Sequence, residues 1–303
     1  MIARRQLLAA VAGFAVLVAV VPAAAQAPAP AKLKVLATFS ILGDFVRNVG
    51  GDRVEVTTLV GPNSDAHVYA PAPADAKKVA DAALVITNGL GFEGWMGRLV
   101  KASGSKAPVL VATKNIKERR AVDSHGHGGA DPHAWQSVAN AKIYVANIRD
   151  ALIAADPAGK SAYEANAAAY LGKLDALDQE VRAAVAAIPA DRRRVISTHD
   201  AFGYFQQAYG IEFIAPQGVS TEAEPSARDV ARIITQVKKQ KIPAVFLENI
   251  ADARLMERIA QETGARIGGK LYSDALTGDL GDATSYIDLI RHNMKQLTVA
   301  LAA

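Results

Sequence analysis

The sequence predicts an α/β fold with two similar lobes, parallel-type sheets and one long rigid helix that joins the lobes. Short apolar segments rich in β-branched residues alternate with amphipathic segments early in the chain, and the alternation restarts near residue 195. Between the two series, residues 158–188 contain almost no helix-breaking residue. Such alternation is typical of parallel strands covered by helices, and 303 residues are enough for about two domains.

The first lobe is predicted to span residues 32–157. Its apolar, β-branched segments predict strands at Leu33–Thr38, Val54–Val60, Ala83–Thr87 and Val109–Thr113, with apolar residues on both faces. Helical periodicity predicts helices at Ile41–Val49, Ala74–Ala82, Glu93–Ala102 and from Val138 to about Asp156.

The linking helix is predicted at residues 158–188. Its larger apolar residues recur at spacings of three, four and seven, which places them on one helical face: Tyr163, Tyr170, Leu174, Leu177, Val181, Val185 and Ile188. A helix of this length spans roughly 46 Å, which is enough to cross both lobes.

The second lobe is predicted to span residues 189–303. Strands are expected at Val195–Thr198, Ile211–Ala215, Ala244–Glu248 and Ala265–Gly268. Helices are expected at Phe202–Ala208, Pro225–Gln240, Ala253–Thr263 and Ala283–Ala300.

The first 25 residues predict a secretory signal peptide. Arg4 and Arg5 precede the apolar run from Leu7 to Val21, and small residues then favour cleavage near Ala25. The alternative, a membrane anchor, is disfavoured because the run is short for a span of about 20 residues. Residues 26–31 are expected to be a flexible leader, and the arginine pair leaves both general and twin-arginine export open.

Charge and cysteine content exclude several classes of protein. Removal of Arg4 and Arg5 lowers the formal net charge from +4 to +2, and no basic block remains that would indicate nucleic-acid binding. The pair Arg119-Arg120 is assigned to a solvated edge. The chain contains no cysteine, so disulfides, thiolate ligands and a lipid-modified cysteine are excluded. We therefore expect a periplasmic protein without a lipid anchor.

Four residues suggest a metal site: His67, His133, His199 and Asp274. Three of them follow predicted strands, where open α/β sheets bind ligands, and His133 lies on a loop. Three imidazoles and a carboxylate match the preference of zinc. If the fold brings the four together, protein atoms alone fill a tetrahedral shell, which suits a carrier better than a catalyst.

The motifs around these residues resemble those of the zinc/manganese solute-binding proteins of ABC importers. The resemblance covers nearly all of the chain after the signal peptide and is carried by the segments 61–67, 88–93, 131–135, 199–205, 216–218 and 224–226, together with Asp274. It implies two lobes, a rigid linking helix and one metal ion between the lobes. Carried over by position, the ligands are His67 and His133 from the first lobe, then His199 and Asp274 from the second.

The resemblance also implies the cargo and the partner. In this family the third ligand is typically His in zinc-type proteins and Glu in manganese-type ones, so His199 favours Zn²⁺ over Mn²⁺. Imidazole suits zinc, whereas carboxylates suit the harder manganese ion. The implied partner is an ABC importer permease in the inner membrane. We expect a monomer that does not bind nucleic acid, with a periplasmic metallochaperone as a further candidate partner.

Other interpretations stay open at this point. His125 and His127 form a short His-Gly tract that is either an auxiliary metal-capture loop or a solvated loop with incidental histidines. A zinc hydrolase would use Asp200 or Glu248 as a general base, and a zinc chaperone would deliver to another protein. The sequence Gly89-Leu90-Gly91-Phe92-Glu93-Gly94 matches the dinucleotide motif G-x-G-x-x-G, but the acid expected about 20 residues later is missing.

Overall fold

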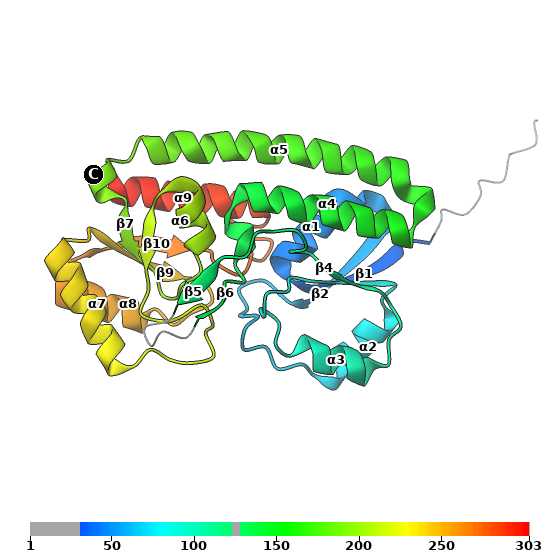
Figure 1. Cartoon of the computed structure of the whole chain (residues 1–303), viewed down its shortest axis with the longest axis horizontal. Helices are drawn as coiled ribbons and strands as arrows, with labels where there is room; N and C mark the ends of the chain where they lie inside the picture. Colours follow the sequence, from blue (N-terminus) through cyan, green and yellow to red (C-terminus); the bar gives the residue numbers. More distant parts are fainter. Residues whose placement is uncertain (1–30, 123–127, 303) are drawn as a thin grey trace, which may run out of the picture. The chain divides into compact units, whose positions relative to one another are not determined.

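The structure, a computed structural model, describes residues 31–122 and 128–302, and it contains two four-stranded parallel sheets (Figure 1). The first sheet has the order β2-β1-β3-β4 and consists of β1 (Leu33–Phe39), β2 (Val54–Val60), β3 (Leu84–Thr87) and β4 (Val109–Val111). The second has the order β10-β9-β7-β8 and consists of β7 (Arg194–Ile196), β8 (Glu212–Ile214), β9 (Ala244–Glu248) and β10 (Arg266–Leu271). The predicted fold class is confirmed.

The two sheets have the same topology. In each, the first strand along the chain pairs with the second on one side and with the third on the other, and the fourth strand lies beyond the third. In α/β sheets of this kind, the carboxyl ends of the strands form the edge at which ligands bind. The helices that accompany the sheets are α1 (Ser40–Gly50), α2 (Pro73–Asp81), α3 (Met96–Ser103), α6 (Gly203–Tyr209), α7 (Ala227–Gln240), α8 (Arg254–Thr263) and α9 (Tyr286–Leu301).

The long helix is α5 (Lys160–Ala186), which follows α4 (Val138–Ala155) and a short 3-10 turn. It packs against α1 and α4 of the first lobe and against α9 of the second (Figure 1). The predicted apolar face is buried at every position, and one hydrophobic core runs through both lobes along it. Its 27 residues span roughly 40 Å, so α5 gives the two sheets a common rigid support.

The structure differs from the predicted elements at sheet edges. Apolar strands were expected to be covered on both faces, but the edge strand β4 leaves Val109 and Val111 each 45% exposed. An edge strand has a neighbour on only one side, so fewer helices cover it. A short antiparallel hairpin, β5 (Arg120–Val122) with β6 (Gly128–Ala130), was not predicted. Three-residue strands are too short to show an alternating pattern.

Several predictions concern parts of the chain that the structure leaves out or does not test. The signal peptide and the leader lie outside the described residues, as do His125 and His127. Among the described residues, no helix has the length and apolar character needed to cross a bilayer. The exact boundaries assigned to the two lobes stay predictions.

Candidate metal centre

The fold brings His67, His133, His199 and Asp274 together. Each residue offers one ligand atom, and these atoms all lie within 4.8 Å of one another. The four side chains are buried, and three of them are completely inaccessible to solvent. Residues up to 207 positions apart in the chain therefore converge on one point, as the sequence predicts.

The nitrogens and oxygens approach one another closely. Asp274 Oδ2 lies 3.3 Å from His67 Nε2 and 3.2 Å from His199 Nε2. Asp274 Oδ1 lies 3.6 Å from His133 Nε2, and the Nε2 atoms of His67 and His133 are 3.2 Å apart. All three imidazoles thus turn their Nε2 atoms toward the carboxylate.

The polar atoms at the centre lack hydrogen-bond partners. In the described part of the chain, both carboxylate oxygens of Asp274 and Nε2 of His199 are buried without such a partner. A buried polar atom left unpaired costs about 1–3 kcal/mol, and more when it is charged. Convergent, unpaired and fully buried acceptors are what a cation site requires.

Asp131 orients the ring of His133. The carboxylate atom Asp131 Oδ1 lies 2.8 Å from His133 Nδ1 and also accepts the backbone N–H of His133 at 3.0 Å. Asp131 Oδ2 accepts a hydrogen bond from Arg119 Nη1 at 2.7 Å. When the carboxylate accepts a hydrogen bond from Nδ1–H, the neutral His133 ring has its lone pair on Nε2, the atom that faces the cluster.

Glu248 does the same for His199 from the end of β9. Its Oε2 atom lies 2.6 Å from His199 Nδ1. Its Oε1 atom accepts the backbone N–H groups of Thr198 at 2.8 Å and of His199 at 3.1 Å. One buried carboxylate therefore fixes both the backbone that follows β7 and the ring that projects from it.

His67 is held through the peptide group that joins it to Ala66. Its N–H donates to Asp65 Oδ1 at 2.9 Å, and the other oxygen of Asp65 accepts the hydroxyl of Thr221, in the second lobe, at 2.6 Å. The indole N–H of Trp95 donates to the carbonyl of Ala66 at 2.8 Å. The ring of His67 packs edge-on against Phe92 at 4.7 Å between centroids.

Asp274 comes from the second lobe, but groups of the first lobe hold its segment. The carbonyl of Ser273 accepts hydrogen bonds from the Trp135 indole at 2.9 Å and from the Gln136 amide at 2.7 Å. The N–H of Leu276 donates to Ser40 Oγ at 3.0 Å. Hydrogen bonds between protein groups thus connect the segment of Asp274 to the first lobe. They hold this segment in place before any metal ion binds.

The charges of the cluster depend on one another. Burial alone lowers the pKa of His133, but the negative charges of Asp274 and Asp131 outweigh it and raise the pKa to about 9. Burial likewise opposes the charged form of His199, yet Glu248 and Asp274 raise its pKa well above the usual value. Burial lowers the pKa of His67. Burial would raise the pKa of Asp274, but His133 and His199 bring it well below its ordinary range.

The glycine-rich turn after β3 does not bind a phosphate. Glu93 Oε1 accepts the backbone N–H of Asn88 at 2.7 Å, and Glu93 Oε2 accepts that of Gly89 at 3.1 Å. These amides are the groups that a dinucleotide phosphate would need, and a buried carboxylate already occupies them. Gly89 (φ +88°) has no room for a side chain because Val111 lies against it. Asn88 in turn donates to the carbonyl of Pro132, next to His133, at 2.9 Å.

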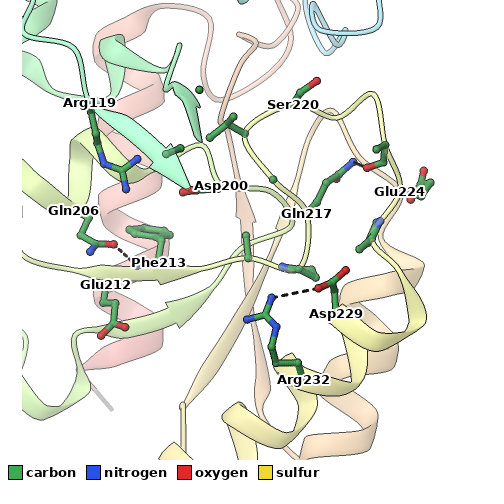
Figure 2. Close-up of a pocket in the computed structure, with 18 residues that line it drawn as sticks. Arg119, Asp200, Gln206, Glu212, Phe213, Gln217, Ser220, Glu224, Asp229 and Arg232 are labelled. Atoms are coloured by element: carbon green, nitrogen blue, oxygen red, sulfur yellow. Dashed lines mark hydrogen bonds and ion pairs between the residues drawn. The ribbon is translucent and has the colours of Figure 1, made fainter. Parts of the chain in front are cut away.

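A separate cavity of about 590 Å³ lies mainly in the second lobe and contains none of the four residues. Figure 2 shows Arg119 and Asp200 on one side of it and the ion pair of Asp229 and Arg232 on the other. Asp200, which the hydrolase interpretation nominates as a base, faces this cavity. Glu248, the other nominated base, hydrogen bonds to Nδ1 of His199.

The sequence missed two residues of the site. Asp131 contacts the ring of His133, and Arg119 contacts Asp131; the assignment of Arg119 to a solvated edge is wrong because its guanidinium pairs with a completely buried carboxylate. A signal was present: Asp131 stands two residues before His133, the spacing at which a carboxylate can accept both the backbone and the ring N–H.

Comparison with known proteins identifies the family. The model of a family described as ZnuA, zinc-uptake complex component A periplasmic, matches residues 35–300. The chain belongs to this family. It is 35% identical over 270 residues to the manganese-binding lipoprotein MntA of Halalkalibacterium halodurans, with 89% of each chain covered. It is 36% identical over 269 residues to the iron-binding protein YfeA of Yersinia pestis, with 89% of this chain and 86% of YfeA covered.

A solved structure has the same fold. The periplasmic zinc-binding protein TroA of Treponema pallidum superposes with a TM-score of 0.85 at 30% identity, covering 90% of this chain and 100% of TroA. The ZnuA-family chain is therefore a metal-binding solute-binding protein of an ABC importer. Members of this family are substrate-binding proteins and not enzymes, which removes the hydrolase interpretation, and their partners are the permease and ATPase components of the importer.

The expected localisation is wrong in one respect. The absence of cysteine led to the prediction of a periplasmic protein without a lipid anchor. MntA is named a lipoprotein, and relatives from Streptococcus species carry the same word in their names. A lipid-modified cysteine is one way of anchoring a protein to a membrane, so cysteine content alone is a poor guide to where members of this family reside.

Proposed function

We propose that this solute-binding protein carries Zn²⁺, bound by His67, His133, His199 and Asp274, to its ABC importer. The observation that carries the proposal is the spacing of the four ligand atoms. Zinc bonds to nitrogen and oxygen of about 2.0–2.1 Å give a tetrahedron whose edges are about 3.3 Å long. Three of the six separations between ligand atoms, at 3.2 Å, 3.2 Å and 3.3 Å, agree with such edges, and all six lie within 4.8 Å.

The donor set supports the same cargo. Three imidazoles and one carboxylate suit zinc, and four buried protein ligands suit a carrier better than a catalyst with an open coordination position. TroA is a zinc-binding protein. Manganese is the alternative cargo because MntA is named for it, and because both oxygens of Asp274 are free to bind one ion together, which a larger coordination shell would use.

Delivery would proceed by ligand exchange when the protein docks on the permease. The continuous helix α5 and the core along it oppose a wide hinge opening. We therefore propose that docking displaces the loops that carry His67 and Asp274, and that the distorted shell releases the ion. Transfer through a metallochaperone and a monomeric state are further expectations of this proposal.

A competition experiment tests the choice of metal. Metal-free protein is titrated with Zn²⁺ in the presence of Mn²⁺ and, in a second series, with Mn²⁺ in the presence of Zn²⁺. We expect one ion per chain and a preference for zinc of more than about tenfold, since affinity for nitrogen-rich sites rises from Mn²⁺ toward Zn²⁺. Equal or tighter binding of Mn²⁺ would reverse the assignment of the cargo.

A further inference from the structure

Arg119 lies between the two segments that carry His133 and His199. Its backbone N–H donates to the hydroxyl of Tyr204 at 2.9 Å, and this hydroxyl also donates to the carbonyl of Lys117 at 3.4 Å. Tyr204 belongs to α6, the helix that begins four residues after His199. The segment before β5 is therefore attached to the second lobe.

The guanidinium of Arg119 lies directly over Gly203, the first residue of α6. A Cβ atom at Gly203 would overlap the guanidinium carbon and Nη1, so the glycine leaves the space that the cation fills. From this position Nη1 donates to Asp131 Oδ2 at 2.7 Å, and the backbone carbonyl of Arg119 accepts the N–H of Asp131 at 2.8 Å. One arginine thus contacts α6 on one side and the carboxylate behind His133 on the other.

Asp131 needs this cation to act on His133. Its carboxylate is completely buried. Oδ1 is hydrogen bonded to the ring of His133, and Oδ2 is hydrogen bonded to the guanidinium of Arg119. Loss of the guanidinium would leave a buried charged oxygen unpaired. The carboxylate would then rotate or take up water, and Oδ1 would no longer hold the ring of His133.

We propose that Arg119 is a positioning residue of the metal site, which acts through Asp131 to hold His133 in its ligating orientation and couples it to the segment of His199. The proposal rests on the proposed four-ligand site. It assigns a role to a residue about which neither the metal-ligand pattern nor the position in the sequence gives any indication.

The first test compares Arg119→Gln with Arg120→Gln in zinc titrations. Both substitutions remove one positive charge from the same short segment, but the side chain of Arg120 is exposed, so it serves as the matched control. We expect Arg119→Gln to weaken zinc binding by about 10- to 100-fold and Arg120→Gln to leave it unchanged. Arg119→Lys should restore part of the loss, because an ammonium supplies the charge without the planar fork.

The second test separates positioning from general stabilisation. If Arg119 acts through Asp131, adding Arg119→Gln to Asp131→Asn causes no further loss of zinc affinity. In NMR spectra of the zinc-loaded protein, the Nδ1 proton signal of His133 should shift in Arg119→Gln, whereas that of His199 should not. Additive losses, or a lower melting temperature with an unchanged His133 signal, would overturn the proposal.

A further variant, Asp274→Asn, distinguishes an error in the role of Arg119 from an error in the four-ligand assignment. If Asp274→Asn does not weaken zinc binding, the four-ligand site is wrong whatever Arg119 does. If Asp274→Asn weakens it and Arg119→Gln behaves like Arg120→Gln, only the role of Arg119 is wrong. Gly203→Ala gives an independent measurement, since it displaces the guanidinium without removing its charge, and it should weaken zinc binding as well.

Discussion

Replacement of Asp274 by Asn should weaken zinc binding by more than about a hundredfold. Residues that only orient ligands typically contribute 10- to 100-fold to metal affinity, and Asp274 is the one anionic member of the cluster. Both of its oxygens are buried without hydrogen-bond partners and face the imidazoles of the cluster, so a cation bound among these residues would interact with the full charge of the carboxylate. An amide is neutral and a far weaker ligand for a divalent cation.

The matched control is Asp279→Asn. Asp279 lies in the same connection between β10 and α9, but its side chain is exposed. We expect its replacement to leave zinc affinity unchanged, because an exposed charge outside the site is screened by water. Isothermal titration with zinc checks both variants. If Asp274→Asn keeps the affinity of the unmodified protein, the carboxylate is not a ligand.

Replacement of Glu248 by Gln should have the second largest effect, on stability as well as on binding. The carboxylate accepts three hydrogen bonds, two from the backbone and one from Nδ1 of His199. An amide offers only one oxygen, and its NH₂ group opposes the remaining donor. We expect a loss of about 1–3 kcal/mol in the free energy of unfolding and a 10- to 100-fold loss in zinc affinity.

Urea unfolding of the metal-free protein and zinc titration check the two effects separately. Glu262→Gln is the control, because Glu262 is exposed and forms a surface ion pair with Arg258, which contributes less than about 1 kcal/mol. Should Glu248→Gln bind zinc as tightly as the unmodified protein, the orientation of His199 would not depend on Glu248.

The sequence predicted the α/β fold class and the four side chains that cluster, because both depend on local patterns. The strand Val54–Val60 and the buried face of α5 follow from periodicity alone. The ligands stand in recognisable motifs, and two follow strand ends. The hairpin β5–β6 escaped prediction because its pairing is decided by tertiary contacts and not by its own residues.

The groups behind the ligands were harder to predict. Glu248 stands at the end of a strand, 49 residues after His199 in the chain. The sequence around Glu248 does not show whether its carboxylate orients a histidine ring or acts as a general base. In the sequence Arg119 looks like a surface charge; that its guanidinium is partly covered and lies against Gly203 and Asp131 is visible only in the structure. The contacts of Glu248 with His199 and of Arg119 with Gly203 depend on how distant parts of the chain pack together. A local sequence pattern carries no information about that packing.

The most direct test of the central claim is the number of protons released when zinc binds. In the metal-free protein, the carboxylates around them raise the pKa of His133 to about 9 and that of His199 well above its usual value, which favours the cationic form of both rings, with a proton on each nitrogen, at neutral pH. Burial lowers the pKa of His67, which favours its neutral form. Zinc binds neutral imidazole, and binding must therefore expel the protons of His133 and His199.

Calorimetric zinc titration at pH 7, in buffers with different enthalpies of ionisation, measures this number. The four-ligand site predicts that zinc binding releases protons, because the raised pKa values of His133 and His199 favour their protonated forms in the metal-free protein. The number should fall as the pH rises through 9, because His133 then loses its proton before the metal arrives. Repeated at pH 5, the titration should show weaker binding, because protons compete with zinc for all three imidazoles. An affinity that stays unchanged from pH 7 to pH 5 would contradict coordination by these histidines.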